Sequence, residues 1–244
     1  MLSLLWKEWH EQSWKLAFGS LILGAFALIG LHARVVADEL LLQWVCFLAV
    51  ALLPVLASTG LIPAERDDGT LESLLSLPIA PWRVFAVKSA MGVVLTAGPI
   101  FVAAIVSVVF AGGREMPGAA MVGLYVRTLA AALSLFFWMY ALTVRLPTET
   151  RASLIAMAVL IMWLLIALGL TQTAEHTVWR PSVEITVPSP SPLWVICPFV
   201  FLIPPKNIGP TLMLGAVFIQ ASIAALLLFW ASSRFARPTV SEGL

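Results

Sequence analysis

The stretch from Glu65 to Lys88 reads ERDDGTLESLLSLPIAPWRVFAVK, and it decides how the rest of the chain is organised. It contains seven charged residues and lies between two long apolar runs. Charged side chains are costly inside a bilayer, so this stretch is expected in water at a membrane surface, between two spans. We predict a short surface helix from about Asp68 to Leu77.

The ends and the apolar face of this predicted helix follow from single residues. Asp67 or Asp68 can cap its first amide groups, because acidic side chains suit the positive end of a helix dipole. Proline stops one helix and can start the next, which are the roles expected here of Pro78 and Pro81. Helical spacing places three leucines on one face, which we expect a partner to bury: Leu71, Leu74 and Leu75.

The composition identifies a polytopic membrane protein. Hydrophobic residues make up 61% of the 244 residues and charged residues only 11%, and the mean hydropathy is +0.99. A soluble domain carries about 25% charged residues. The net charge of +1 includes no basic patch that would indicate nucleic acid. Cys46 and Cys197 lie in apolar surroundings and are expected to be buried thiols, with no metal or redox motif.

The apolar runs predict an all-α fold with six membrane spans in a single transmembrane domain, 1–244. A span needs about 20 apolar residues. The spans are expected at about 16–31, 40–63, 84–111, 121–144, 152–171 and 211–231. Within the third span, Gly98 and Pro99 indicate either a hinge or a kink that packing accommodates. Lys88, near the start of that span, is expected to extend to the inner surface.

Residues 1–15 predict a separate amphipathic helix in the membrane interface. Leu2, Leu5, Trp6 and Trp9 lie along one side of it, and tryptophan favours the headgroup level. The alternative is a cleaved signal peptide, but the charged start is long, contains two acids and lacks a clear cleavage site.

Two outer features are candidates for a transport path or gate. Arg127 lies either inside the fourth span or, if that span begins after it, among the outer headgroups. Residues 172–210 are rich in proline, including Pro198, and contain an apolar segment half as long as a span. Such a segment is typical of a re-entrant structure, and the alternative is an ordered outer loop on the bilayer.

The basic residues predict the orientation. With both termini and the loops at 64–88 and 145–151 inside, nine lysines and arginines lie inside and four outside, with Arg127 left unassigned. Cytoplasmic loops carry the excess of such residues. We therefore expect both termini in the cytoplasm, in the inner membrane of a prokaryote.

The central stretch resembles the loop after the second span in permease subunits of ABC-2 type ABC transporters. The residues that carry the resemblance are Glu65, Gly69, Thr70, Leu71, Glu72, Leu75, Pro78 and Lys88. The resemblance extends to the surrounding spans. It implies that loop 64–83 carries a coupling helix, which docks on a separate ATP-binding subunit that holds ATP and magnesium. It also implies an interfacial elbow helix at residues 1–15 and outer half-helices between the last two spans.

The residues expected to act in docking or coupling are Glu65, Asp68, Gly69, Thr70, Leu71, Glu72, Leu74, Leu75 and Pro78. We expect no catalytic, cofactor or metal site in this chain. No glycine precedes a lysine, so the phosphate-binding loop of ATPases is absent and the chain is not itself an enzyme. The expected partners are the cytoplasmic ATPase and a second permease copy, or a related permease.

Two other functions stay open at the sequence level. One is a membrane enzyme or anchoring subunit with an outer site near Arg127 and His176, and the other is a passive channel. The aliphatic spans favour export of a lipid, hydrophobic peptide or drug-like molecule over that of ions or sugars.

Overall fold

The computed structural model describes residues 2–32, 38–76, 78–110, 118–176, 192–202 and 210–235. Within these ranges the chain is helical. Six helices are long and apolar enough to cross a membrane, which confirms the predicted fold class: α1 (Leu2–His32), α2 (Asp38–Leu61), α5 (Pro81–Phe110), α6 (Gly118–Thr143), α7 (Glu149–His176) and α9 (Pro210–Phe235). The remaining described elements are short: α3 (Pro63–Asp67), α4 (Thr70–Leu75), α8 (Pro192–Ile196) and the 3-10 helix η1 (Pro198–Phe201).

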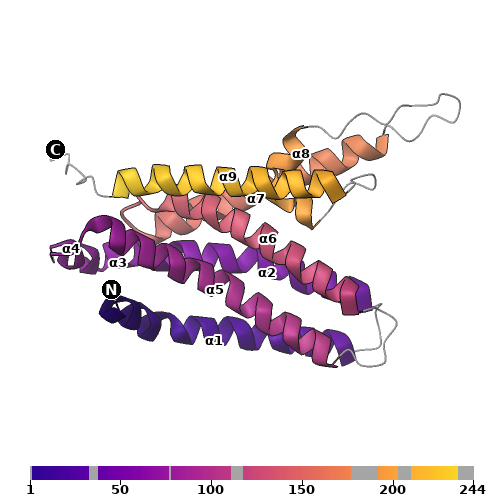
Figure 1. Cartoon of the computed structure of the whole chain (residues 1–244), viewed down its shortest axis with the longest axis horizontal. Coiled ribbons are helices and arrows are strands. Elements are labelled where there is room, and N and C mark those ends of the chain that lie inside the picture. The colour runs from indigo at the N-terminus through magenta and orange to yellow at the C-terminus, as the bar shows by residue number, and fades with distance from the viewer. Residues whose placement is uncertain are drawn as a thin grey trace, which may run out of the picture.

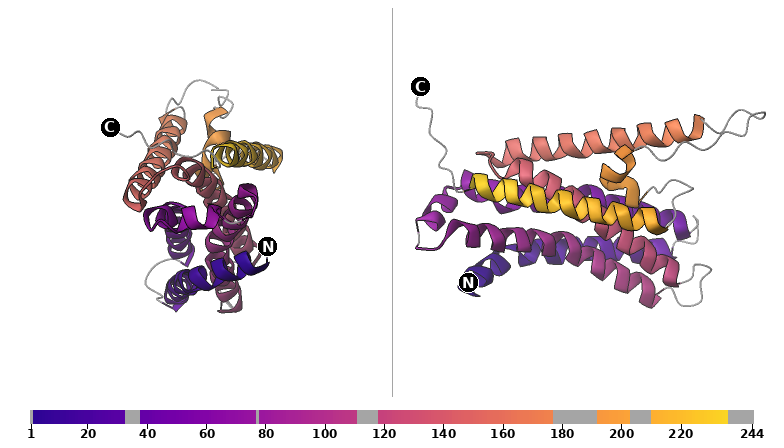
Figure 2. Two further views of the ribbon diagram at one scale, coloured as in Figure 1. Left: turned by 90° about the vertical axis from the view of Figure 1, so that its left-hand side faces the viewer. Right: turned by 45° about the horizontal axis from the view of Figure 1, so that its top comes forward.

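The six long helices run along the long axis of the molecule (Figure 1). Helix α1 packs along α5 and α2, and α2 packs against α5, α6 and α7. Helix α6 contacts α9 and α7 on its other side. The bundle therefore has α1 and α5 at one side, α2 and α6 in the middle, and α7 and α9 at the opposite side (Figure 2).

One end of the bundle collects the start of α1, the end of α9, and both α3 and α4 (Figure 1). The connection from α6 to α7 lies at the same end. The last turns of α1, α5 and α7 and the first turns of α2, α6 and α9 lie at the other end. The chain thus crosses back and forth as the six predicted spans require.

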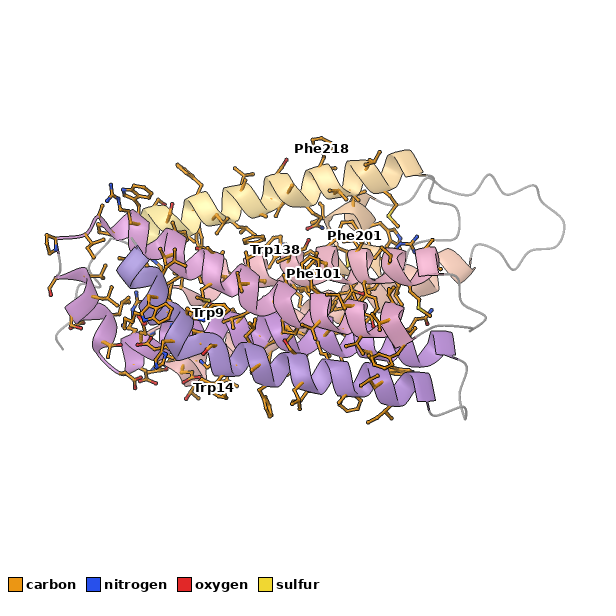
Figure 3. All side chains as sticks on the ribbon, turned by 60° about the horizontal axis from the view of Figure 1, so that its bottom comes forward. Trp9, Trp14, Phe101, Trp138, Phe201 and Phe218 are labelled. Carbon is orange, nitrogen blue, oxygen red and sulfur yellow. The ribbon has the colours of Figure 1, made fainter. Side chains whose placement is uncertain are left out.

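Residues 2–15 form the first turns of α1 and not a helix of their own, which corrects the predicted boundary after residue 15, whereas their place in the membrane interface stays a prediction. No glycine or proline interrupts the helix before Gly19. Figure 3 shows that these turns run at an angle to the rest of α1. Trp6, Trp9 and Trp14 are exposed, as residues at a membrane interface would be, whereas Glu8 and Gln12 face the protein.

The interior consists of two apolar clusters that share α2, α5 and α6. One fills the middle of the bundle and the end that contains α8 and η1. The other lies at the end that contains α3 and α4. The outward sides of the long helices are apolar and exposed, as at Phe101 and Phe218 (Figure 3). This distribution fits helices surrounded by lipid.

Small residues set how closely the helices approach. Gly98 faces Leu16 of α1, where an added Cβ would lie 2.7 Å from the Leu16 Cδ1 atom. One turn away on α1, a Cβ at Gly19 would lie 3.3 Å from Cγ of Pro99. Gly98 and Pro99 therefore lie where α5 crosses α1, which favours a role in packing.

Gly92 allows α5 to cross close to α6, because it has no side chain at the crossing. A Cβ there would collide with the ring of Phe136 and with Leu61, and both side chains are fully buried. We expect Gly92→Ala to destabilise the protein by about 1–3 kcal/mol, as overpacking of a core does. The measurement is thermal stability in detergent, followed by size-exclusion chromatography.

The matched control is Gly123→Ala in α6, where a Cβ would meet nothing within 4 Å. Alanine favours a helix over glycine, so this variant is expected to be as stable as the parent or slightly more stable. Equal losses in both variants would contradict the close contact at Gly92.

Candidate functional site

The candidate site is the end of the bundle formed by α3 and α4, the stretch that the sequence singled out. Gly69 separates the two short helices with a φ of 70°, a left-handed conformation that suits glycine. The predicted helix from Asp68 to Leu77 is therefore shorter than expected, because α4 begins at Thr70 and ends at Leu75. Leu77 lies outside the described residues.

The predicted capping of this helix by an acid is wrong. Asp68 follows the last residue of α3 as its C-cap, and Gly69 precedes α4 without any side-chain cap. The Asp67 carboxylate instead accepts a hydrogen bond at 3.2 Å from the backbone N–H of Glu149, the first residue of α7. An acid there satisfies a free amide at the positive end of α7. Asp67 thus ties α3 to the second connection at this end.

The leucine face of α4 is buried in the subunit itself. Leu71 is 2% exposed and Leu74 5%, and both belong to the apolar cluster that includes Ile62, Val84 and Tyr140. Leu75 is half-buried against the same cluster. Our expectation that Leu71 and Leu74 are free to be buried by a partner is therefore wrong. Their helical spacing was interpreted correctly, but their contacts are internal.

The side of this stretch that faces solvent is polar and acidic. Between residues 67 and 78 its exposed residues are Asp67, Asp68, Gly69, Thr70, Glu72, Ser73, Ser76 and Pro78. Two serines bond within it, as the Ser73 hydroxyl donates to the Thr70 carbonyl at 2.7 Å and the Ser76 hydroxyl to the Ser73 carbonyl at 2.7 Å. This surface, which we call the α4 surface, is one part of the predicted coupling loop that another protein can reach, and the exposed Trp82 and Arg83 lie farther along the same loop.

Beneath the α4 surface lies a group of buried charges. The Lys88 Nζ atom is fully buried and donates a hydrogen bond at 2.7 Å to Oε1 of Glu8, on α1. It also lies 2.7 Å from Oε1 of Glu65, on α3, and 3.4 Å from the carbonyl oxygen of Leu61, to which it donates. The Glu65 contact is an ion pair without hydrogen-bond geometry, and both Glu65 oxygens lack a hydrogen-bond partner among the described residues.

Two expectations are corrected by this charge cluster, which consists of Glu8, Glu65 and Lys88. Lys88 does not extend to the membrane surface, because two carboxylates hold it inside. Glu65 is not an exposed docking group, since its side chain is only 11% exposed and points toward Lys88. The sequence signal was a lysine in an apolar run, which needs a buried counter-charge whenever it is not at the surface.

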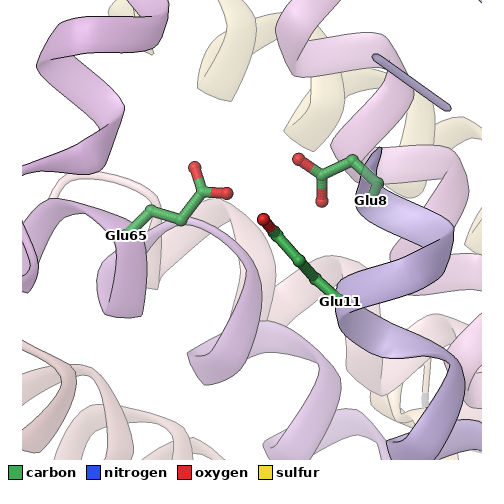
Figure 4. Close-up of side chains that lie close together, drawn as sticks. All are labelled: Glu8, Glu11 and Glu65. Carbon is green, nitrogen blue, oxygen red and sulfur yellow. The ribbon is translucent and has the colours of Figure 1, made fainter. Parts of the chain in front are cut away.

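The oxygens of Glu8, Glu11 and Glu65 approach within 4.8 Å of one another, a spacing that a metal ion could use (Figure 4). However, the Lys88 ammonium lies 2.7 Å from two of these three carboxylates. A second cation beside it would be repelled. The arrangement fits a lysine-centred ion cluster better than a metal site.

Comparison with known proteins identifies the family. The sequence model of the "ABC-2 family transporter protein" matches residues 10–231, which include parts of all six long helices and the whole of α3 and α4. The chain belongs to the ABC-2 transporter family. A comparison with curated proteins gives no match.

The outer candidates of this ABC-2 transporter do not meet the charge cluster. Arg127 is exposed on α6 and forms no ion pair within the described part of the chain. Pro198 begins η1 and is buried. Helices α8 and η1 pack among α6, α7 and α9, whereas residues 177–191 and 203–209 lie outside the described residues. The side chain of His176 is also outside them.

Gln220 is a residue that sequence reasoning missed. Its side-chain N–H groups donate to the carbonyl oxygens of Val195 at 3.0 Å and Ile196 at 2.6 Å, at the end of α8. Free carbonyl groups at a helix end are costly away from water, and the buried amide satisfies them. A single glutamine within the apolar run of α9 was the signal available in the sequence.

The charge cluster contains two acids and one base, and this imbalance leads to a prediction. Lys88→Met leaves Glu8 buried without a cation and Glu65 with only the partly exposed Lys7 at 4.0 Å, and removing one partner of a buried pair costs about 3–5 kcal/mol. Glu8→Gln leaves Lys88 paired with Glu65 and is expected to cost clearly less. Thermal stability in detergent compares the two variants, and equal losses would show that the carboxylates do not share the lysine.

Proposed function

We propose that this chain is the transmembrane permease subunit of an ATP-driven exporter. Family membership supports a transport role in the membrane. A separate cytoplasmic ATP-binding subunit, with ATP and magnesium, would supply the energy. The chain would act with a second copy of itself or with a related permease, in the inner membrane of a prokaryote.

The observation that carries this proposal is the two-sided placement of α4. One side is the exposed α4 surface at an end of the bundle, and the other side is packed into the apolar cluster. The flanking residues are attached to three spans, because Asp67 binds the start of α7 and Glu65 contacts Lys88 of α5 beside Glu8 of α1. A displacement of α4 would therefore reach α1, α5 and α7.

The polar character of the α4 surface also limits what can dock there. Asp67, Asp68 and Glu72 give it negative charge, with Arg66 half-buried next to them. Charge complementarity sets partner choice and the rate of encounter. We infer that the ATPase presents a groove with basic and hydrogen-bonding groups, and that the leucines transmit movement without touching the partner.

The position of the α4 surface also fits the orientation predicted from the basic residues. One end of the bundle contains the start of α1, the end of α9, and both α3 and α4. The excess of lysine and arginine in the sequence predicts that this end faces the cytoplasm. The ATPase and its nucleotide are in that compartment. The substrate that we favour is a lipid, hydrophobic peptide or drug-like molecule, because the spans are mostly aliphatic and contain few polar groups.

Docking is tested by reversing charge on the α4 surface. We expect Glu72→Lys to reduce co-purification of the ATPase strongly while leaving the thermal stability of the permease within about 0.5 kcal/mol, since Glu72 is exposed. The matched control is Glu72→Asp, which keeps the negative charge at the same exposed position and is expected to keep the ATPase yield of the parent. Normal ATPase yield with Glu72→Lys would contradict docking at this surface.

Sidedness is tested by labelling a cysteine at Ser73, which is exposed on α4. A membrane-impermeant maleimide is expected to label Ser73→Cys in inside-out vesicles and not in intact cells. The native Cys46 and Cys197 are buried, and buried thiols react poorly, so the parent protein is the blank. Labelling from outside intact cells would place α4 on the wrong side for an ATPase.

A further inference from the structure

Oε1 of Glu65 lies between two lysines that belong to different helices. It is 2.7 Å from Nζ of Lys88 on α5 and 4.0 Å from Nζ of Lys7 on α1. The two lysines differ in environment. Lys88 is fully buried, whereas the Lys7 side chain is 41% exposed and also pairs with Glu11 at 3.6 Å.

The bond between Glu65 and Lys88 is the part of the charge cluster that can be released. Lys88 already has a fully buried carboxylate in Glu8, to which it donates a hydrogen bond. Its contact with Glu65 lacks hydrogen-bond geometry. If Glu65 moved away, Lys88 would remain paired, and the large penalty for an unpaired buried charge would not arise.

Lys7 can receive Glu65 when it leaves. A shift toward Lys7 moves the carboxylate toward the exposed edge of the cluster, where its free oxygens also gain water. The second position therefore also pairs the charge of Glu65 with a lysine. A two-state element needs two distinct arrangements of this kind.

The choice of lysine determines which span α3 is attached to. With Lys88, α3 is attached to α5, and with Lys7 it is attached to the first turns of α1. Glu65 lies two residues before the Asp67 that binds the start of α7. Movement of α3 and α4 would thus be passed to different helices in the two arrangements.

We propose that Glu65 is a positioning residue that passes from Lys88 to Lys7 when ATP binding by the partner displaces α4. This inference rests on the proposed function, because it needs an ATPase to move α4. It adds a specific switch: Glu8 keeps Lys88 neutralised throughout, while Glu65 alternates.

The test measures displacement of α4 in the purified complex with its ATPase, in nanodiscs. Spin labels on Ser73→Cys of α4 and Ala90→Cys of α5, both exposed positions, report the distance between the helices. Distances are recorded without nucleotide and with ATP and vanadate. We expect the parent to populate a displaced distance with nucleotide, and Lys7→Gln to reduce that population about two- to fivefold, as loss of a partly exposed ion pair allows.

Three companion variants separate the switch from general charge effects. Lys7→Arg keeps the charge and is expected to restore the displaced population. Lys15→Gln removes another lysine of α1, which lies over Trp14 and has no ion pair with Glu65 among the described residues, and is expected to behave like the parent. Glu11→Gln releases Lys7 from its other partner and is expected not to lower the displaced population.

Each outcome decides the matter. A displaced population in Lys7→Gln equal to that of the parent overturns the switch and leaves the proposed function intact. A parent complex that assembles but shows no displacement overturns the switch too. Failure of the parent to bind any ATPase overturns the proposed function first, and the switch with it.

Discussion

Burial of one ammonium group constrains the whole end of the bundle where α3 and α4 lie. Lys88 has no exposed surface, so it requires a counter-charge close by. The two acids that meet it, Glu8 and Glu65, come from α1 and α3, and their helices must therefore converge on α5. This requirement also explains the first turns of α1. Glu8 and Gln12 turn toward the protein and the tryptophans turn outward, which is the reverse of a soluble amphipathic helix.

Away from this cluster, close packing and a few polar contacts hold the spans together. Within a membrane, helices associate without the driving force that water supplies, so small residues at crossings and hydrogen bonds between helices matter more. Gly92 and Gly98 provide the crossings of α5 with α6 and α1. At the other end, Gln220 holds the short helix α8 against α9 by hydrogen bonds to its last carbonyl groups. The charge cluster holds the short helix α3 in a similar way, through a buried polar group.

The six spans could be predicted because each is an apolar run of sufficient length, a property of local sequence. The partners of individual side chains could not, because they come from distant segments. Lys88 and Glu8 are 80 residues apart, and nothing near Lys88 in the sequence announces that pairing. The leucines of α4 illustrate the same limit: spacing places them on one face but does not say whether that face meets the subunit or a partner. Asp67 could have capped α4, yet the start of α7 lies close enough to take its carboxylate.

Helix α4 contains only six residues, far fewer than a peptide needs to stay helical in water. Its shape therefore depends on the leucines that anchor it to the rest of the subunit. A synthetic peptide copied from this loop would be unstructured in solution and would lose binding energy in ordering itself. If the ATPase docks on the α4 surface as proposed, inhibitors that imitate the loop would have to be stapled or cyclised, and they would have to present its polar side in place of its leucines.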